Sequence, residues 1–139
     1  MPTDPVKAAL DATTYQLTQC VKGMPESAMD ARATPDGMTP RDMLEHLCEC
    51  YEAYMAICDG KQWNWGSYKA PDRATAPLVE TWKATRQKAV SRCLGSDDAQ
   101  ARENAMHYIA LHDAYHVGQL CLIRLAAQPE WDAHSIYRE

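Results

Sequence analysis

Apolar residues recur at spacings of three and four along four long segments of this sequence, and this periodicity limits what the chain can fold into. The first segment starts at Thr3-Asp4-Pro5, an N-cap signal with proline at the first helical position. Thr39-Pro40 repeats the signal before the second segment. No stretch alternates apolar and polar residues as a half-buried strand would. We therefore expect an all-α protein with helices at about 3–23, 40–59, 77–94 and 98–127.

The lengths of the connections restrict the topology. The third and fourth helices are joined by a few residues only, so they must be antiparallel neighbours. Residues 61–76 join the second helix to the third, and when extended they reach about 50 Å, longer than a helix of about 20 residues. These two helices can therefore run parallel. We expect one domain, residues 1–139, folded as an up-down-down-up four-helix bundle in preference to a plain up-down bundle, with a loop at 24–38.

Charge and composition exclude several classes of function. The chain has 14 Lys and Arg against 19 Asp and Glu, a net charge of −5 with no basic stripe, which argues against a nucleic-acid partner and against an anionic membrane surface. No apolar run approaches the length of a membrane span, and no signal peptide is visible, so we expect a cytoplasmic protein. Its six cysteines are then expected to be reduced thiols.

Three of the five histidines fall where they can share a metal ion. His112 and His116 are four residues apart on one helical face, which also carries Ile109, Leu120 and Ile123 and should point into the core. His46 is the lone histidine of the second helix and can supply a third ligand. The alternative is that each ring is simply hydrogen-bonded in the core. His107 and His134 are expected to lie at the surface.

Two segments resemble signatures of a known family. Thr39-Pro40-Arg41-Asp42-Met43-Leu44-Glu45-His46-Leu47 and His112-Asp113-Ala114-Tyr115-His116-Val117-Gly118-Gln119-Leu120 are similar to the helix-two and helix-four motifs of the DinB-like superfamily of small four-helix proteins. The resemblance implies an up-down-down-up bundle, usually dimeric, with a divalent metal (nickel, zinc or iron) on His46, His112 and His116. It also implies a small residue, Gly118, and an amide, Gln119, able to orient a ligand. Relatives transfer low-molecular-weight thiols such as bacillithiol or mycothiol, isomerise with a thiol, or hydrolyse.

The sequence leaves the reaction open. Three nitrogen ligands leave coordination positions free, as in catalytic metal sites, so a metal-activated water could hydrolyse a small molecule or a thiol cosubstrate could be transferred. Glu49 is the best candidate for a base or for a partner behind the ligands, although a solvated carboxylate has the same pattern. Cys50 follows His46 by four residues and could approach the metal, although a place in the core is the expectation, and Asp113 is expected to point away from His112. A non-catalytic metal-binding or stress-associated bundle stays an alternative. A zincin-like peptidase is disfavoured because Asp113 replaces the glutamate of H-E-x-x-H.

Overall fold

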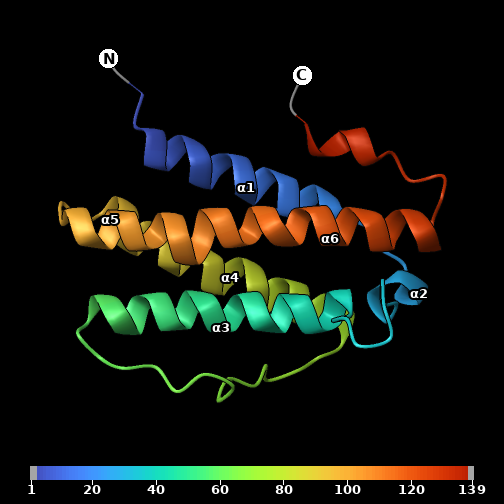
Figure 1. Ribbon diagram of the computed structural model, residues 1–139, viewed down its shortest axis with the longest axis horizontal. Coiled ribbons are helices and arrows are strands. Elements are labelled where there is room, and N and C mark those ends of the chain that lie inside the picture. Colours follow the sequence, from blue (N-terminus) through green and yellow to red (C-terminus); the bar gives the residue numbers. More distant parts are fainter. Residues whose placement is uncertain (1–2, 138–139) are drawn as a thin grey trace.

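The fold is known from a computed structural model that describes residues 3–137, and it is all-α, as predicted (Figure 1). Among the described residues there is no strand. The helices are α1 (Pro5–Val21), α2 (Glu26–Met29), α3 (Pro40–Cys58), α4 (Thr75–Leu94), α5 (Ala99–Ala105), the π-helix η1 (Met106–Leu111), α6 (His112–Ala127) and the 3-10 helix η2 (Ala133–Ile136). The helix segments predicted from the periodicity agree with these bounds to within about three residues.

The predicted caps explain where the long helices begin. The Asp4 carboxylate accepts hydrogen bonds from the backbone N–H groups of Val6 and Lys7. At the start of α3, Thr39 and Asp42 form a reciprocal capping box, with Pro40 at the first helical position. Each cap satisfies backbone donors that have no partner inside the helix. The N-termini of α1 and α3 are therefore set by local sequence.

Contacts between helix ends give the direction of each long helix. Arg41, at the start of α3, donates to the Thr75 hydroxyl at the start of α4, and Arg92 near the end of α4 bonds Asp59 just after α3. Thus α3 and α4 run the same way. These two helices form one layer, and α1 and α6 form the other. In that second layer, Asp4 before α1 pairs with Arg102 of α5, and Arg124 of α6 donates to the Lys22 carbonyl after α1. The helices α1 and α6 therefore also run in the same direction.

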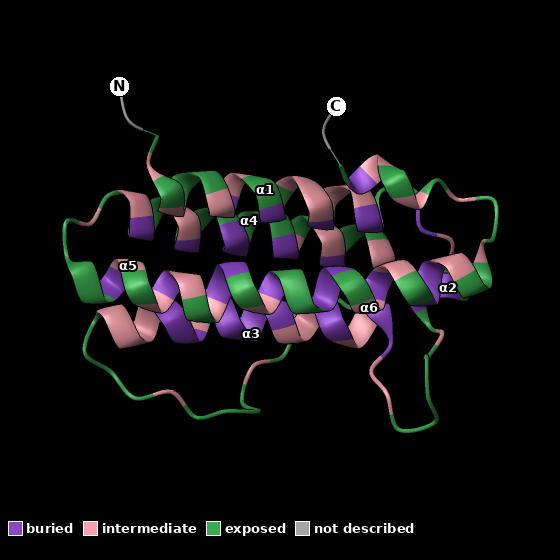
Figure 2. Ribbon diagram, turned by 45° about the horizontal axis from the view of Figure 1, so that its top comes forward, coloured by how far each residue is buried: buried purple, intermediate pink, exposed green. Residues whose placement is uncertain are grey.

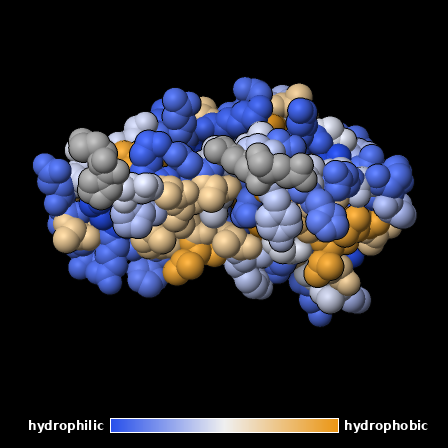
Figure 3. Space-filling model, turned by 90° about the horizontal axis from the view of Figure 1, so that it is seen from above, coloured by the Kyte–Doolittle hydropathy of each residue, from blue (hydrophilic) through white to orange (hydrophobic). Residues whose placement is uncertain are grey.

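The two layers run in opposite directions. The Tyr54 hydroxyl, near the end of α3, donates to the Ala101 carbonyl at the start of α5. Figure 2 shows that the buried residues lie on the sides of the helices that face one another. Seen from above, the surface is mostly hydrophilic, with hydrophobic atoms gathered in patches (Figure 3). Within residues 3–137 no helix combines the length and the apolar run needed to cross a membrane.

Two features depart from the expected pattern. Residues 24–38, expected as a loop, contain the short helix α2, which buries Ala28 and Met29 against the core. The last long helix is not a uniform α-helix, because η1 joins α5 to α6 as six residues of π-helix. A π turn has one more residue per hydrogen-bonded ring, so it rotates the following residues relative to the preceding ones. In this chain η1 ends directly before His112 and so sets which way α6 faces.

Candidate metal centre

Helices α3 and α6 bring together the three histidines that the sequence singled out. The Nε2 atom of His112 lies 3.2 Å from Nε2 of His46 and 3.1 Å from Nε2 of His116. The ligand atoms of all three residues lie within 4.8 Å of one another. Their rings meet edge to face, with centroids 4.6 to 5.5 Å apart. We call His46, His112 and His116 the histidine cluster.

Helix geometry explains why the cluster forms. His112 and His116 are one turn apart at the start of α6, so both rings leave the same side of that helix. His46 lies in the second turn of α3, which runs antiparallel to α6 and faces it. The capping box at Thr39 and Asp42 fixes the start of α3 and therefore the height of His46 along the bundle.

The electrostatics of the cluster favour neutral rings. Burial lowers the pKa of His112 and of His116 to about 4 each, and the neighbouring histidines add to the effect. Burial also lowers the pKa of His46, while the Glu49 carboxylate opposes that shift. Neutral imidazoles offer lone pairs, and acceptor nitrogens this close repel one another unless a proton or a cation lies between them. The donor set therefore fits a divalent metal ion.

The outer nitrogens of two rings are unsatisfied. Nδ1 of His112 and Nδ1 of His116 are buried and have no hydrogen-bond partner within residues 3–137. The Gln119 side chain opposes the lowering of the His116 pKa, yet within residues 3–137 the Gln119 Oε1 is buried without a hydrogen bond, and its Nε2 donates to the Tyr115 hydroxyl at 3.1 Å. Gln119 thus lies beside His116 without a formed hydrogen bond to it.

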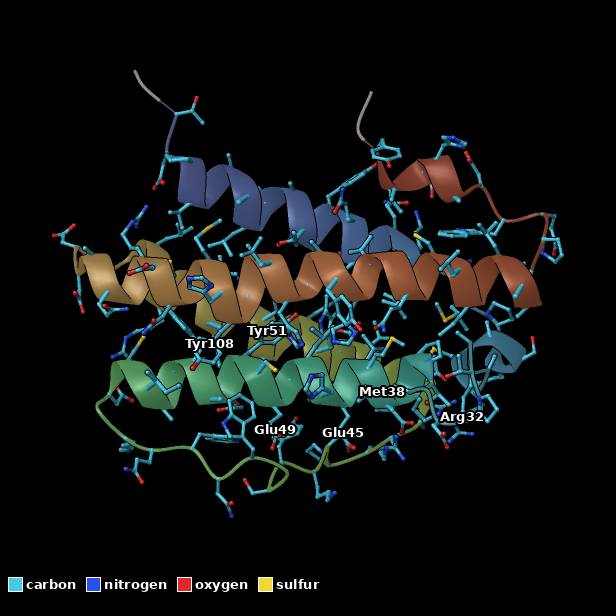
Figure 4. The ribbon with its side chains drawn as sticks, viewed as in Figure 1. Arg32, Met38, Glu45, Glu49, Tyr51 and Tyr108 are labelled. Atoms are coloured by element: carbon cyan, nitrogen blue, oxygen red, sulfur yellow. The ribbon has the colours of Figure 1, made fainter. Side chains whose placement is uncertain are left out.

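Glu49 has a different set of partners from the one expected. Its two carboxylate oxygens accept hydrogen bonds from the backbone N–H groups of Gly66 and Tyr68, at 3.0 to 3.1 Å. Gly66 has a φ of 88°, in the left-handed region that favours glycine. Glu45 accepts from the Ala70 N–H in the same way. Both carboxylates point from α3 toward the connection between α3 and α4 and hold it against α3 (Figure 4).

A small cavity opens beside His46. Its volume is about 170 Å³, and it lies between α3 and the α3–α4 connection, with Met38, Tyr68 and Lys69 in its lining. Farther along, Trp65 of the connection stacks on Tyr108 of η1, with ring centroids 6.4 Å apart, and Trp65 is half exposed. The connection therefore reaches across from α3 to η1, the helix that directly precedes His112.

Of the other residues considered in the sequence analysis, Cys50 lies next to the histidine cluster, whereas His107, His134 and Asp113 lie away from it. Cys50 is buried with its Sγ 3.8 Å from His46 Nε2, at the edge of the cluster. His107 and His134 are exposed, as expected. Asp113 is fully buried, and because neighbouring residues of a helix are about 100° apart around its axis, its side chain leaves α6 in a different direction from that of His112, as predicted.

Asp113 belongs to a buried polar group that the sequence did not reveal. The Tyr51 hydroxyl donates to one carboxylate oxygen at 2.8 Å, and Arg86 of α4 forms an ion pair with the other. Arg86 also donates to the Leu10 carbonyl and the Thr13 hydroxyl of α1. In the sequence, the network is indicated only by two charged residues, Asp113 and Arg86, that each lie on an apolar helical face. We call Asp113, Arg86 and Tyr51 the Arg86–Asp113 network.

Comparisons of the chain with protein-family models, with curated proteins and with solved structures found no match. The arrangement of side chains therefore carries the functional argument. It brings together His46, His112 and His116, which can hold a metal ion.

Proposed function

We propose that this protein is a DinB-like, metal-dependent enzyme, an up-down-down-up four-helix bundle that binds a divalent metal (nickel, zinc or iron) through His46, His112 and His116. Its proposed reaction is the transfer of a low-molecular-weight thiol to a small electrophile. The observation that carries the proposal is the convergence of three Nε2 atoms from two helices, with neighbouring contacts of 3.1 and 3.2 Å. Three neutral nitrogens are a common ligand set for catalytic zinc and related metals.

The surrounding residues support thiol transfer over hydrolysis. A divalent metal lowers the pKa of a bound thiol or water and so supplies the nucleophile. Hydrolysis of an ester or amide further calls for a carboxylate that takes and returns a proton. Both oxygens of Glu49 already accept backbone hydrogen bonds, and both oxygens of Asp113 are engaged by Tyr51 and Arg86. A thiol ionises at a lower pKa than water, so its transfer depends less on such a base.

The walls of the site favour a small substrate with an apolar part. The cavity beside His46 has room for a few heavy atoms only. On the α6 side, the Tyr115 ring packs edge-on against His116 with centroids 5.2 Å apart, and Tyr115 is 63% exposed. Tyr115 therefore offers a partly exposed aromatic surface beside His116, against which an apolar group can pack.

Metal titration tests the site itself. Calorimetric titration of the full chain, purified without a metal-binding tag, with Zn²⁺ or Ni²⁺ should give a single stoichiometric site. His112→Ala should abolish that binding. His107→Ala, an exposed histidine five residues away, is the matched control and should bind like the unchanged protein. Stoichiometric binding by the His112→Ala protein would overturn the proposal.

Turnover separates the reaction classes. The metal-loaded protein is assayed against thiol-plus-electrophile pairs and against simple esters, each with and without added metal. Activity that needs both thiol and metal supports the transferase. Activity on esters without thiol would replace it with a hydrolase, and silence across the panel would leave a non-catalytic metal-binding bundle.

We also propose a homodimer built on the exposed side of α6. Leu111, Tyr115 and Leu122 are each more than half exposed and follow one another on one helical face. Gly118 lies between them, and a side chain there would meet no atom within 4 Å, which leaves room for a neighbouring helix to approach closely. Light scattering at micromolar concentration should give twice the chain mass, and Leu122→Glu should give monomers. A monomeric unchanged protein would contradict the dimer.

A further inference from the structure

Two cysteines lie in contact across the seam between α1 and α6, away from the histidine cluster. Cys20 on α1 and Cys121 on α6 have their sulfur atoms 3.7 Å apart, although 101 positions separate them in the chain. Figure 1 shows α1 and α6 side by side, and the Cys20 thiol is also 3.9 Å from the Val117 carbonyl of α6. A disulfide has its sulfurs about 2.05 Å apart, so the two atoms must approach by roughly 1.7 Å.

The surroundings of the pair make the two sulfurs unequal. Cys20 is fully buried, whereas Cys121 is partly exposed. Arg124, one turn after Cys121, donates to the Cys20 and Lys22 carbonyls at 2.8 Å, which holds the end of α1 against α6 and leaves a cation near both thiols. The hydrogen bond from the Cys20 thiol lowers the pKa of Cys121, and the Arg124 cation adds to this effect. The same hydrogen bond raises the pKa of Cys20. Cys121 is thus the accessible, more nucleophilic sulfur and Cys20 the sulfur behind it.

We propose that Cys20 and Cys121 form an oxidation site at which a small hydroperoxide converts the two thiols into a disulfide linking α1 to α6. In the first step the Cys121 thiolate attacks a peroxide oxygen, the O–O bond breaks, hydroxide or alkoxide leaves, and Cys121 becomes a sulfenic acid. In the second step the Cys20 sulfur attacks the Cys121 sulfur and the S–O bond breaks. The Cys20 proton leaves with that oxygen as water. The two cysteines lose two electrons, and the peroxide gains them.

The disulfide would restrain the chain on a large scale. It would close a loop of about 100 residues, which removes conformational freedom from the unfolded chain. It would also fix the end of α1 to the helix that carries His112 and His116. The oxidised protein should therefore unfold at a higher urea concentration than the reduced protein, and dithiothreitol should reverse the shift.

The test uses the full chain, reduced and then treated with hydrogen peroxide in buffer containing a chelator, so that no bound metal takes part. After denaturation, four of the six cysteines should react with N-ethylmaleimide, and the chain mass should fall by two hydrogen atoms before labelling. Proteolysis should yield the Cys20 and Cys121 peptides joined, and dithiothreitol should separate them.

Matched variants locate the reaction. Cys121→Ser changes a partly exposed residue and should leave no disulfide, as should Cys20→Ser. Cys58→Ser, which replaces the other partly exposed cysteine, should form the disulfide like the unchanged protein. The proposal is overturned if all six cysteines stay reactive in a folded, peroxide-treated protein. It is overturned equally if the joined peptides contain other cysteines, or if Cys121 proceeds to a sulfinic acid while Cys20 stays free.

Discussion

Adjacent residues on α6 face two polar clusters of opposite character. His112 meets His46 of α3 in the histidine cluster, while Asp113 reaches Tyr51 of α3 and Arg86 of α4 in the Arg86–Asp113 network. In the network, both carboxylate oxygens of Asp113 have donors, and Arg86 uses its Nε and both Nη atoms. In the histidine cluster, two Nδ1 atoms are buried and have no partner in the described part of the chain, and three Nε2 atoms lie close together.

That difference is the one expected between a purely structural cluster and a cluster that can hold a metal ion. Burying a polar atom without a hydrogen bond costs about 1–3 kcal/mol, so a fold keeps such atoms when something outside the chain satisfies them. The network is complete within the protein and needs nothing further. The histidine cluster is incomplete, and a cation would resolve the crowding of its lone pairs. Variants that disrupt one cluster and leave the other intact should therefore have different effects.

Breaking the network should have the largest effect. Arg86→Met leaves the Asp113 carboxylate buried without its cation, and removing one partner of a buried ion pair costs about 3–5 kcal/mol. Urea unfolding should show this loss, while metal stoichiometry of the folded protein should not change. The double variant Arg86→Met, Asp113→Leu removes both charges and should recover most of the stability. A single variant as stable as the unchanged protein would contradict the assignment.

Breaking the histidine cluster should instead remove the increase in the free energy of unfolding that a bound metal ion provides. Ligand present at 100 times its dissociation constant stabilises a protein by about 2.7 kcal/mol. The unchanged protein should therefore gain about that much with Zn²⁺, and His116→Ala should gain none. His134→Ala, which changes an exposed histidine, is the control and should keep the gain. An equal gain in the His116→Ala protein would show that the ion binds elsewhere.

The two clusters should also respond to acid in opposite directions. The folded-state pKa of His112 and of His116 is lowered to about 4, so their contribution to stability is present above about 6.5 and is lost as pH falls toward 4. Burial raises the pKa of Asp113 to about 6, against the opposing effects of Arg86 and Tyr51, so its contribution grows as pH falls through that range. Subtracting the curve of a His112→Ala, His116→Ala protein isolates the histidines.

In metal-free protein that difference should amount to about 2 kcal/mol between pH 6.5 and 4, after a discount for solvent screening, to which the partly exposed His112 ring is more subject than the buried His116 ring. Urea unfolding at several pH values measures it. If the unchanged protein and the His112→Ala, His116→Ala protein lost the same free energy of unfolding between pH 6.5 and 4, the rings would titrate as they do in the unfolded chain, and the prediction would be wrong.

The contrast between the clusters also explains what the sequence could predict. The caps at Asp4 and Thr39 and the spacing of His112 and His116 are local features, so helix bounds and the α6 half of the site followed from short segments. His46 could be added because it is the one histidine on its helix. The close approach of the three histidines was thus predictable, whereas metal binding, the family and the reaction stay proposals.

The remaining features depend on contacts that no short segment encodes. The partner of Asp113 lies 27 positions away on another helix, and that of Cys20 lies 101 positions away. The π turn of η1 adds a residue to a pattern of threes and fours without disturbing it visibly. Glu49 looked like a solvated or catalytic carboxylate, because nothing local shows that the α3–α4 connection returns to it.

The smallest predicted effect concerns Glu49, which shares a property with each cluster. Like a member of the histidine cluster, its carboxylate acts on the pKa of His46. Like a member of the Arg86–Asp113 network, it has hydrogen-bond donors within the protein, here the backbone of the α3–α4 connection. Glu49→Gln keeps the shape but offers the Gly66 and Tyr68 N–H groups a neutral acceptor, so we expect a loss of about 1 kcal/mol in urea unfolding and faster proteolysis within residues 59–74. Glu52→Gln, on the same helix, is the matched control and should change neither the stability nor the rate of proteolysis.

Because Glu49 does not hold a histidine ring of the cluster by a hydrogen bond, Zn²⁺ stoichiometry should be the same in the Glu49→Gln protein. If Glu49→Gln abolished Zn²⁺ binding and left proteolysis of the connection unchanged, Glu49 would have to be reassigned from holding the connection to supporting the histidines.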